Sequence, residues 1–288
     1  MALPRPGSAI QIFLLLTVLL SSIFWGLIIA AGHVGAGGGH YVEALMWCPA
    51  VAALVTLGFR GLGTASLGLS RIGGKFALAG YLVPLGYALV GYTVVWGWGL
   101  GYFPDHAAIA AIASRLGWQS TEPASFVPLY FILTATTGMI GASARALGEE
   151  IGWRGFMAPR LVARYGFTGG AVLGGLIWAL WHMPLLLFAD YHSATPWWFA
   201  MTCFTVMVVG SSVILTWFRL RSDSVWPCVL CHASHNVFIQ SFFTPLTGAR
   251  GSVTAYMIDE FGVALALTVL GTAILFWRMR ASVRIASA

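Results

Sequence analysis

Long runs of apolar residues, separated by short polar stretches, occupy most of this chain. Eight of these runs have the length of about 17 to 25 residues that an α-helix needs to cross a lipid bilayer. They lie at residues 10–31, 41–59, 76–100, 126–148, 170–188, 197–218, 225–244 and 259–277. The pattern predicts an all-α, polytopic transmembrane helical bundle of about eight spans, with residues 1–288 forming a single integral membrane domain.

The first run has one feature of a secretory signal, because Arg5 precedes it and small residues end it at Ala30 and Ala31. It is longer than the apolar region of about 7 to 15 residues in a typical signal peptide. We therefore expect a retained span. Within the run at 170–188, Gly170 and Gly174, and one residue later Ala171 and Gly175, form small-xxx-small pairs that favour close helix packing. A glycine-rich apolar helix also shows such pairs by chance.

Composition excludes a soluble domain, since 59% of the residues are hydrophobic and only 8% are charged, against about 25% charged in soluble proteins. The basic residues also alternate between loops, as the positive-inside rule requires. The side that carries both termini holds Arg5, Arg60, Arg71, Lys75, Arg145, Arg154, Arg160, Arg164, Arg219, Arg221, Arg278, Arg280 and Arg284, whereas Arg115 and Arg250 fall on the other. This division predicts that both termini are cytoplasmic. It also accounts for the net charge of +6 without a nucleic-acid partner.

The candidate chemistry begins at the end of the fourth run, in Glu149-Glu150-Ile151-Gly152-Trp153-Arg154. Ionisable groups inside a membrane are costly and usually functional. Glu150 and Arg154 stand at i and i+4 and can form an ion pair within one helix. Arg145 stands four residues before Glu149, so a purely structural pairing of both acids is an open alternative.

Two later runs carry the other polar groups. His182 lies in the fifth run, and His232 and Asn236 lie at i and i+4 on one face of the seventh. Counting from the cytoplasmic side places His232 about 10 Å and His182 about 18 Å deep, with Glu149 near the cytoplasmic end of its span. The three levels differ, and we expect helix tilt to bring them together in a site that opens toward the cytoplasm.

The order E-E-x-x-x-R, then an aromatic-x-x-x-His helix, then H-x-x-x-N resembles the CPBP family of intramembrane CAAX prenyl proteases and bacteriocin-processing proteins, which includes the Ras-converting endopeptidase. The resemblance covers residues 126–244, the predicted spans four to seven, as a catalytic core. One position departs from the family pattern, because the second motif usually opens with Phe and here has Trp178. The indole adds a ring N–H that a phenyl group lacks.

The resemblance implies an intramembrane endopeptidase in which Glu149 is the general base that activates water, assisted by His182. His232 and Asn236 would bind the oxyanion, with Glu150, Arg154 and Trp178 as supporting residues. A carboxylate and two donors on one helix face are suitable groups for this chemistry. The implied substrate is a membrane-associated peptide or protein.

Several alternatives are open at this stage. No cofactor is expected, but Glu149, His182 and His232 could supply three zinc ligands of a metalloprotease. Cys228 and Cys231 invite a second metal hypothesis; like Cys48 and Cys203, they are expected to be reduced, buried thiols. The same polar groups would also suit a non-proteolytic membrane scaffold or a small proton-coupled carrier.

The content of Ala, Gly and Arg, with a single Lys, is typical of a bacterial, GC-rich source. The bacterial inner membrane is therefore the expected location of this multi-pass protein. Among family members, the bacterial ones are associated with peptide maturation and bacteriocin immunity.

Overall fold

A computed structural model describes residues 6–283 and confirms the predicted all-α fold. The first half of the chain forms α1 (Pro6–Ala31), η1 (Ala36–Gly39), α2 (His40–Phe59), η2 (Thr64–Leu67), α3 (Lys75–Gly97), β1 (Gly101–Tyr102), α4 (His106–Leu116), α5 (Pro123–Leu133), η3 (Thr134–Gly138) and α6 (Met139–Glu150). The second half forms η4 (Ile151–Met157), α7 (Ala158–Phe188), α8 (Trp197–Ser222), α9 (Trp226–His235), η5 (Asn236–Phe243), β2 (Gly248–Ala249), α10 (Val253–Met257), α11 (Val263–Arg278) and η6 (Met279–Ser282). Segments η3, η4 and η5 are π-helical.

Six helical segments of the described chain are long and apolar enough to cross a membrane. They are Ser8–Ala31, Ala36–Phe59, Lys75–Gly97, Pro123–Phe188, Trp197–Ser222 and Val263–Ser282. The fourth has 66 residues and contains the predicted spans at 126–148 and 170–188, which are divided at Gly166 by a non-helical φ of 69° and ψ of 173°. The predicted span at 225–244 corresponds to α9 and η5, which carry several polar residues and are not among the six.

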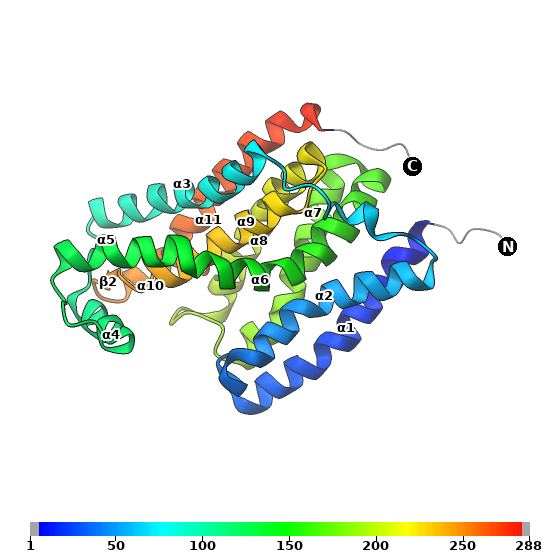
Figure 1. The fold of residues 1–288 in the computed structure, drawn as a ribbon. Coiled ribbons are helices and arrows are strands. Elements are labelled where there is room, and N and C mark those ends of the chain that lie inside the picture. Colours follow the sequence, from blue (N-terminus) through cyan, green and yellow to red (C-terminus); the bar gives the residue numbers. More distant parts are fainter. Residues whose placement is uncertain (1–5, 284–288) are drawn as a thin grey trace.

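Contacts between loops define the two ends of the bundle. We call the end at which α1 begins and α11 finishes the terminal end (Figure 1). There, Arg60 Nη1 after α2 donates to Ser8 Oγ in α1 over 2.9 Å. The N–H of Val225, between α8 and α9, donates to the carbonyl of Gly68, between α2 and α3. These links place the ends of α2 and α8 beside the starts of α1, α3 and α9.

Different loops meet at the opposite end. Asp190 follows α7 and accepts a 2.7 Å hydrogen bond from the N–H of Val34, which follows α1. Strand β1, after α3, pairs antiparallel with β2, after η5. The chain therefore runs from the terminal end to the opposite end in α1, α3, α7 and α9–η5, and it returns in α2, α5–α6–η4, α8 and α11.

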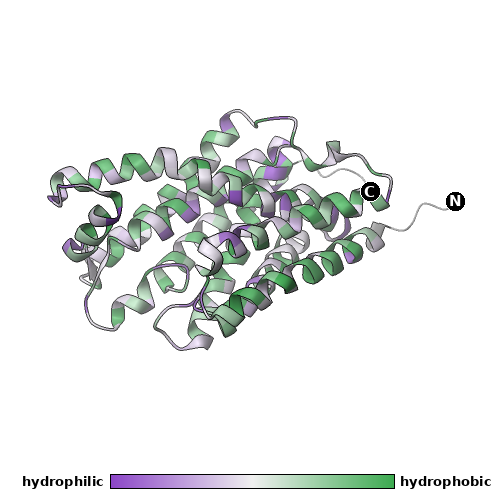
Figure 2. Ribbon diagram, turned by 60° about the horizontal axis from the view of Figure 1, so that its bottom comes forward, coloured by the Kyte–Doolittle hydropathy of each residue, from purple (hydrophilic) through white to green (hydrophobic). Residues whose placement is uncertain are grey.

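The outer surface of the bundle is apolar, as a protein in contact with lipid requires. Leu15, Leu19 and Ile23 of α1 are exposed, and the helix that follows the N-terminus is predominantly hydrophobic in Figure 2. Leu78 and Leu82 in α3 are similarly exposed. These faces would meet the acyl chains of a membrane.

Small residues bring α7 and α8 close together, which bears out the packing prediction for this span. A Cβ atom on Gly175 would lie only 2.8 Å from Cα of Val209 in α8. Beside it, Ser212 Oγ donates to the carbonyl of Ala171 over 2.9 Å. Gly170 instead approaches the N-terminal part of its own helix, where an added Cβ would be 2.6 Å from the backbone of Val162.

The charged residues deviate from the predicted division at two positions. Arg154 is buried inside the bundle with 1% exposure. Arg145 lies 3.6 Å from Glu43 Oε1, in the first turn of α2 near the opposite end. The sequence assigned both to the cytoplasmic surface because it ended the fourth span at residue 148, whereas the helical chain continues well beyond that residue.

Candidate active site

Glu149 and Glu150 lie inside the bundle because two glycines let their helix approach α2 closely. A Cβ on Gly148 would be 2.7 Å from the Met46 carbonyl, and one on Gly152 would be 2.5 Å from Pro49. All seven residues of η4, which follows the two acids, are buried. The turn that carries the carboxylates is therefore pressed into the core, with 2% exposure at Glu149 and 0% at Glu150.

Glu150 is held by two hydrogen-bond donors. Its Oε1 accepts a 2.9 Å hydrogen bond from Arg154 Nη1, which is the predicted i, i+4 pair. The same oxygen lies 2.9 Å from Nδ1 of His232. Because a carboxylate only accepts, the proton of this bond belongs to Nδ1, and the Nε2 atom of His232 is left for another partner. The guanidinium of Arg154 also stacks over the ring of Trp178 at 4.0 Å.

Glu149 has different partners, as the 100° rotation between adjacent helical residues requires. Its Oε2 accepts a 2.7 Å hydrogen bond from Nε1 of Trp178 and a 3.3 Å bond from Nε1 of Trp153. Arg145 pairs with Glu43 rather than with Glu149, so the alternative in which both acids are paired within their own helix is wrong for Glu149. The indole N–H that distinguishes Trp178 from the Phe of the family pattern is the donor of the shorter bond.

His182 lies one turn after Trp178 in α7. Its Nδ1 is 2.8 Å from the carbonyl of Trp178. Because a carbonyl oxygen can only accept a hydrogen bond, the proton of this bond lies on Nδ1. Nε2 then carries a lone pair. The ring packs against Trp181 and Phe204, with centroid separations of 4.9 and 5.1 Å.

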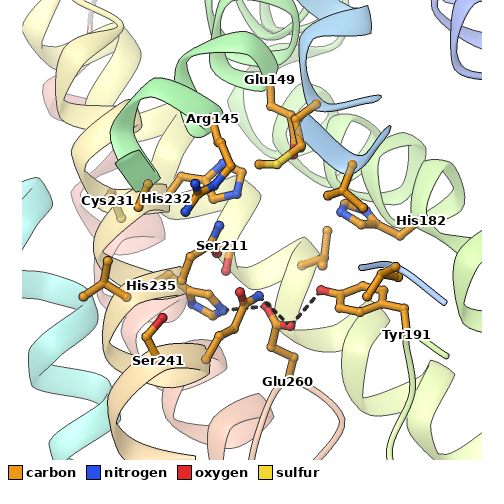
Figure 3. Close-up of a pocket in the computed structure, with 18 of the residues that line it drawn as sticks. Arg145, Glu149, His182, Tyr191, Ser211, Cys231, His232, His235, Ser241 and Glu260 are labelled. Atoms are coloured by element: carbon orange, nitrogen blue, oxygen red, sulfur yellow. Dashed lines mark hydrogen bonds and ion pairs between the residues drawn. The ribbon is translucent and has the colours of Figure 1, made fainter. Parts of the chain in front are cut away.

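The four predicted catalytic residues, Glu149, His182, His232 and Asn236, all line one cavity of about 760 Å³. Figure 3 shows Glu149, His182 and His232 around this space. Glu149 lies deeper in the bundle than predicted, because its side chain contacts Trp178 in α7 and the adjacent Glu150 contacts His232 in α9. The sequence estimate was wrong at Glu149, whose helical chain continues through η4 into α7 before the break at Gly166.

A second polar cluster occupies the same cavity nearer the opposite end. Glu260, in the loop before α11, accepts hydrogen bonds from Tyr191 Oη at 2.7 Å, Gln240 Nε2 at 3.0 Å and His235 Nε2 at 3.1 Å. His235 Nδ1 lies 2.6 Å from Oη of Tyr87. His235 thus lines the cavity and forms hydrogen bonds with both of its ring nitrogens.

The hydrogen bonds explain why Glu260 stays ionised. Burial by itself raises the pKa of this carboxyl, but the bonds and charge from His235 and the donors from Tyr191 and Gln240 outweigh it and hold the pKa below its ordinary value. Sequence reasoning missed Glu260, Tyr191 and Glu43, and it assigned Arg145 to the cytoplasmic end of a helix. The one available signal for Glu260 was the pair of acids, Asp259 and Glu260, at the start of the last predicted run.

The cavity has a closed side and an open side. Toward the terminal end it stops at Glu149, Trp178 and Cys231, beyond which the residues of η4 are buried. Toward the opposite end its lining includes Gly35, Tyr191 and Glu260, which belong to interhelical connections. The predictions of cytoplasmic termini and of a cytoplasmic opening therefore exclude each other in this structure.

Metal ligation was an alternative for the same residues. Within residues 6–283, no group of three His, Cys, Asp or Glu side chains is arranged to hold a metal ion. The Sγ of Cys228 contacts the Leu215 carbonyl at 3.2 Å, and Cys231 is buried in the hydrophobic core. Both thiols are free, as are those of Cys48 and Cys203.

Comparison with known proteins finds similarity over part of the chain. Residues 123–238 match the type II CAAX prenyl endopeptidase Rce1-like family. A stretch of 101 residues is 29% identical to CAAX prenyl protease 2 of Methanococcus maripaludis and covers 34% of each chain. The alignment thus spans about a third of the length of this relative. The segment from α5 to the start of η5 is therefore similar to CAAX prenyl endopeptidases.

Proposed function

We propose that this protein is an intramembrane endopeptidase that hydrolyses a peptide bond of a membrane-associated peptide or protein. The observation that carries the proposal is the convergence of Glu149, His182, His232 and Asn236 from three helical segments on one cavity. The matches to CAAX prenyl endopeptidases support the same reaction class. The bacterial inner membrane is the proposed location.

The proposed reaction uses a water molecule between Glu149 and the carbonyl carbon of the substrate. The carboxylate of Glu149 takes a proton from the water as its oxygen attacks, and it returns a proton to the leaving amine when the peptide bond breaks. The Nε2 atom of His182 has a free lone pair, because the ring proton is on Nδ1 and is donated to the Trp178 carbonyl. It can therefore accept a hydrogen bond from the water and orient it.

The developing oxyanion would be held by the side-chain amide of Asn236 and by Nε2 of His232. For Nε2 to donate while Nδ1 also donates to Glu150, the ring of His232 must be protonated. The adjacent carboxylates favour this charged form. With Glu149 and Glu150 ionised, Arg154 and protonated His232 give a site of balanced charge, which a buried cluster requires.

We propose that the reaction needs no metal ion. Two of the alternative zinc ligands, His182 and His232, already use Nδ1 in hydrogen bonds within the protein, although Nε2 of each would be free to ligate. Treatment with a chelator distinguishes the two mechanisms, since hydrolysis by Glu149 alone is expected to be unchanged and a zinc mechanism is expected to stop.

The test is cleavage of a quenched-fluorescent peptide library by detergent-purified protein. Glu149→Gln keeps the shape of the side chain and removes the base, so we expect activity to fall at least about a thousandfold. Asn236→Ala should reduce kcat by about 100-fold to 1,000-fold, the usual effect of losing one oxyanion donor. Equal cleavage by the wild type and Glu149→Gln would refute the proposal and favour a carrier or a scaffold.

A further inference from the structure

The ends of the bundle differ strongly in charge. Among the described residues, the terminal end carries Arg60, Arg71, Lys75, Arg160, Arg164, Arg219, Arg221, Arg278 and Arg280 with the single acid Asp223. The opposite end carries Glu43, Asp105, Glu122, Asp190, Asp259 and Glu260 with the bases Arg115, Arg145 and Arg250. Lys and Arg near the ends of spans are retained on the cytoplasmic side of a membrane. The terminal end is therefore the cytoplasmic end.

The candidate site lies deep below that end and is closed toward it. The helix turn with Glu149 packs beside Trp47 of α2, while α2 reaches the terminal end at Phe59. At 1.5 Å per residue, this separation is about 18 Å. The side chains of Trp153, Arg154 and Phe156 fill the intervening layer with at most 1% exposure. These buried side chains separate Glu149 from the terminal end.

The cavity instead reaches the surface at the other side of the bundle. Glu43 of α2 and Arg145 of α6 meet at its edge, and each side chain is 44% exposed. Thr137 is an exposed lining residue in η3, and Gly35 is an exposed lining residue between α1 and α2. Figure 1 shows α2 and α6 diverging toward the opposite end. An ion pair and a hydroxyl group thus stand at this edge of the cavity.

From these two observations we infer that the protein takes its substrate from the non-cytoplasmic side of the membrane. Its substrate class would be membrane-anchored peptides or proteins whose cleavage site lies in, or just outside, the outer half of the bilayer. The claim that the protein cleaves such a substrate rests on the proposed function. The orientation of the cavity rests on charge and geometry alone, so it can be tested without any measurement of activity.

The orientation test uses single-cysteine variants and a membrane-impermeant maleimide. The four native thiols are buried, so wild type provides the background. Thr137→Cys reports on the cavity, Ser252→Cys on the opposite end and Thr64→Cys on the terminal end; all three side chains are exposed. Each variant is treated in intact spheroplasts, in inside-out vesicles and in detergent, where all three must react.

We expect Thr137→Cys and Ser252→Cys to react in spheroplasts, and Thr64→Cys to react in inside-out vesicles. Reaction of Thr64→Cys in spheroplasts would show an inverted chain and overturn the inference. The inference would also fail if Thr137→Cys reacted only in inside-out vesicles or in neither preparation. Repeating the labelling with the additional change Glu149→Gln should give the same pattern, because orientation does not depend on hydrolysis.

A second measurement links the orientation to the proposed function. An impermeant quenched peptide cleaved by the purified protein is supplied to spheroplasts and to inside-out vesicles. We expect at least tenfold faster cleavage in spheroplasts, and the reverse ratio would overturn the inference. Labelling as expected in a protein that cleaves no peptide even in detergent would leave the orientation established and refute only the proposed function.

Discussion

At the scale of single residues, the Trp178 indole is the feature that most distinguishes this site. Its N–H donates to Glu149 over 2.7 Å, and its ring lies under the guanidinium of Arg154. One side chain thus contacts both the proposed base and the ion pair that supports it. A phenyl ring at this position would keep the cation–π contact, although less strongly, and would lose the hydrogen bond.

We therefore predict that Trp178→Phe lowers kcat about tenfold, with little change in KM. The lost charge-assisted hydrogen bond is of the order of 1.5 to 3 kcal/mol, of which Trp153 can restore a part. Trp217→Phe is the matched control, because Trp217 donates its indole N–H to Met279 near the terminal end, far from the cavity. Steady-state kinetics of both variants provide the measurement, and equal kcat values would refute a role for the Trp178 N–H.

Glu150 gives a second prediction at this scale. Glu150→Gln leaves Arg154 buried without an anionic partner, which typically costs about 3 to 5 kcal/mol. We expect thermal unfolding in detergent at a markedly lower temperature and almost complete loss of activity. In the double variant Glu150→Gln/Arg154→Met, stability should largely return while activity stays low, because His232 still lacks its carboxylate partner. Recovery of activity together with stability would show that Glu150 serves packing alone.

At the scale of elements, the loop before α11 responds to pH through Asp259. Burial raises the pKa of this carboxyl to about 7, and the neighbouring Glu260 adds to the increase. The folded protein therefore binds this proton more tightly than the unfolded chain, whose ordinary pKa is near 4. Stability from this group is greatest below about pH 4 and declines as the pH rises toward about 7.

The corresponding experiment compares thermal unfolding of the wild type and Asp259→Asn between pH 5 and pH 8. We expect the difference in stability to move in favour of the variant as the pH rises, by on the order of 1 to 3 kcal/mol over this range. Asp105→Asn is a control, because Asp105 is an N-cap at the same end of the bundle with a different environment. A constant difference between the wild type and Asp259→Asn would contradict the raised pKa.

Some elements of the fold could be predicted from the sequence, and others could not. Apolar runs located the helices of the bundle, and the polar residues in spans four, five and seven identified the groups that line the cavity. The run that ends at residue 148 did not reveal η4, because Gly152, Trp153 and Arg154 look like a polar helix end. In the structure their burial is made possible by the close approach to Pro49, a tertiary contact that no local pattern encodes.

At the scale of the whole molecule, the cavity needs more of the chain than the segment that carries the family motifs. Residues 123–238 match the family, yet α2 contributes Glu43 and Met46, α3 contributes Tyr87, and the loop before α11 contributes Glu260. These residues lie far apart in the sequence. Their part in the site was not predictable because helix packing alone brings them together.

This arrangement predicts the behaviour of a divided protein. The connection between α4 and α5 is short and largely exposed, so a break after Ser120 separates two helical groups without cutting a helix. Transmembrane helices that are already formed can associate in the bilayer. We expect residues 1–120 and 121–288 to be inactive alone and to recover at least about a tenth of the activity when they are produced together, as measured by peptide cleavage after joint purification.

A shorter fragment of residues 121–244 provides the contrast, because it contains the family motifs but lacks α11 and the Glu260 loop. With residues 1–120 supplied, it should copurify poorly and stay inactive, since α11 packs against both α3 and α8. Activity in the fragment alone would show that spans four to seven are an autonomous catalytic core. In that case the cavity-lining residues from α2, α3 and the loop before α11 would serve only to select the substrate.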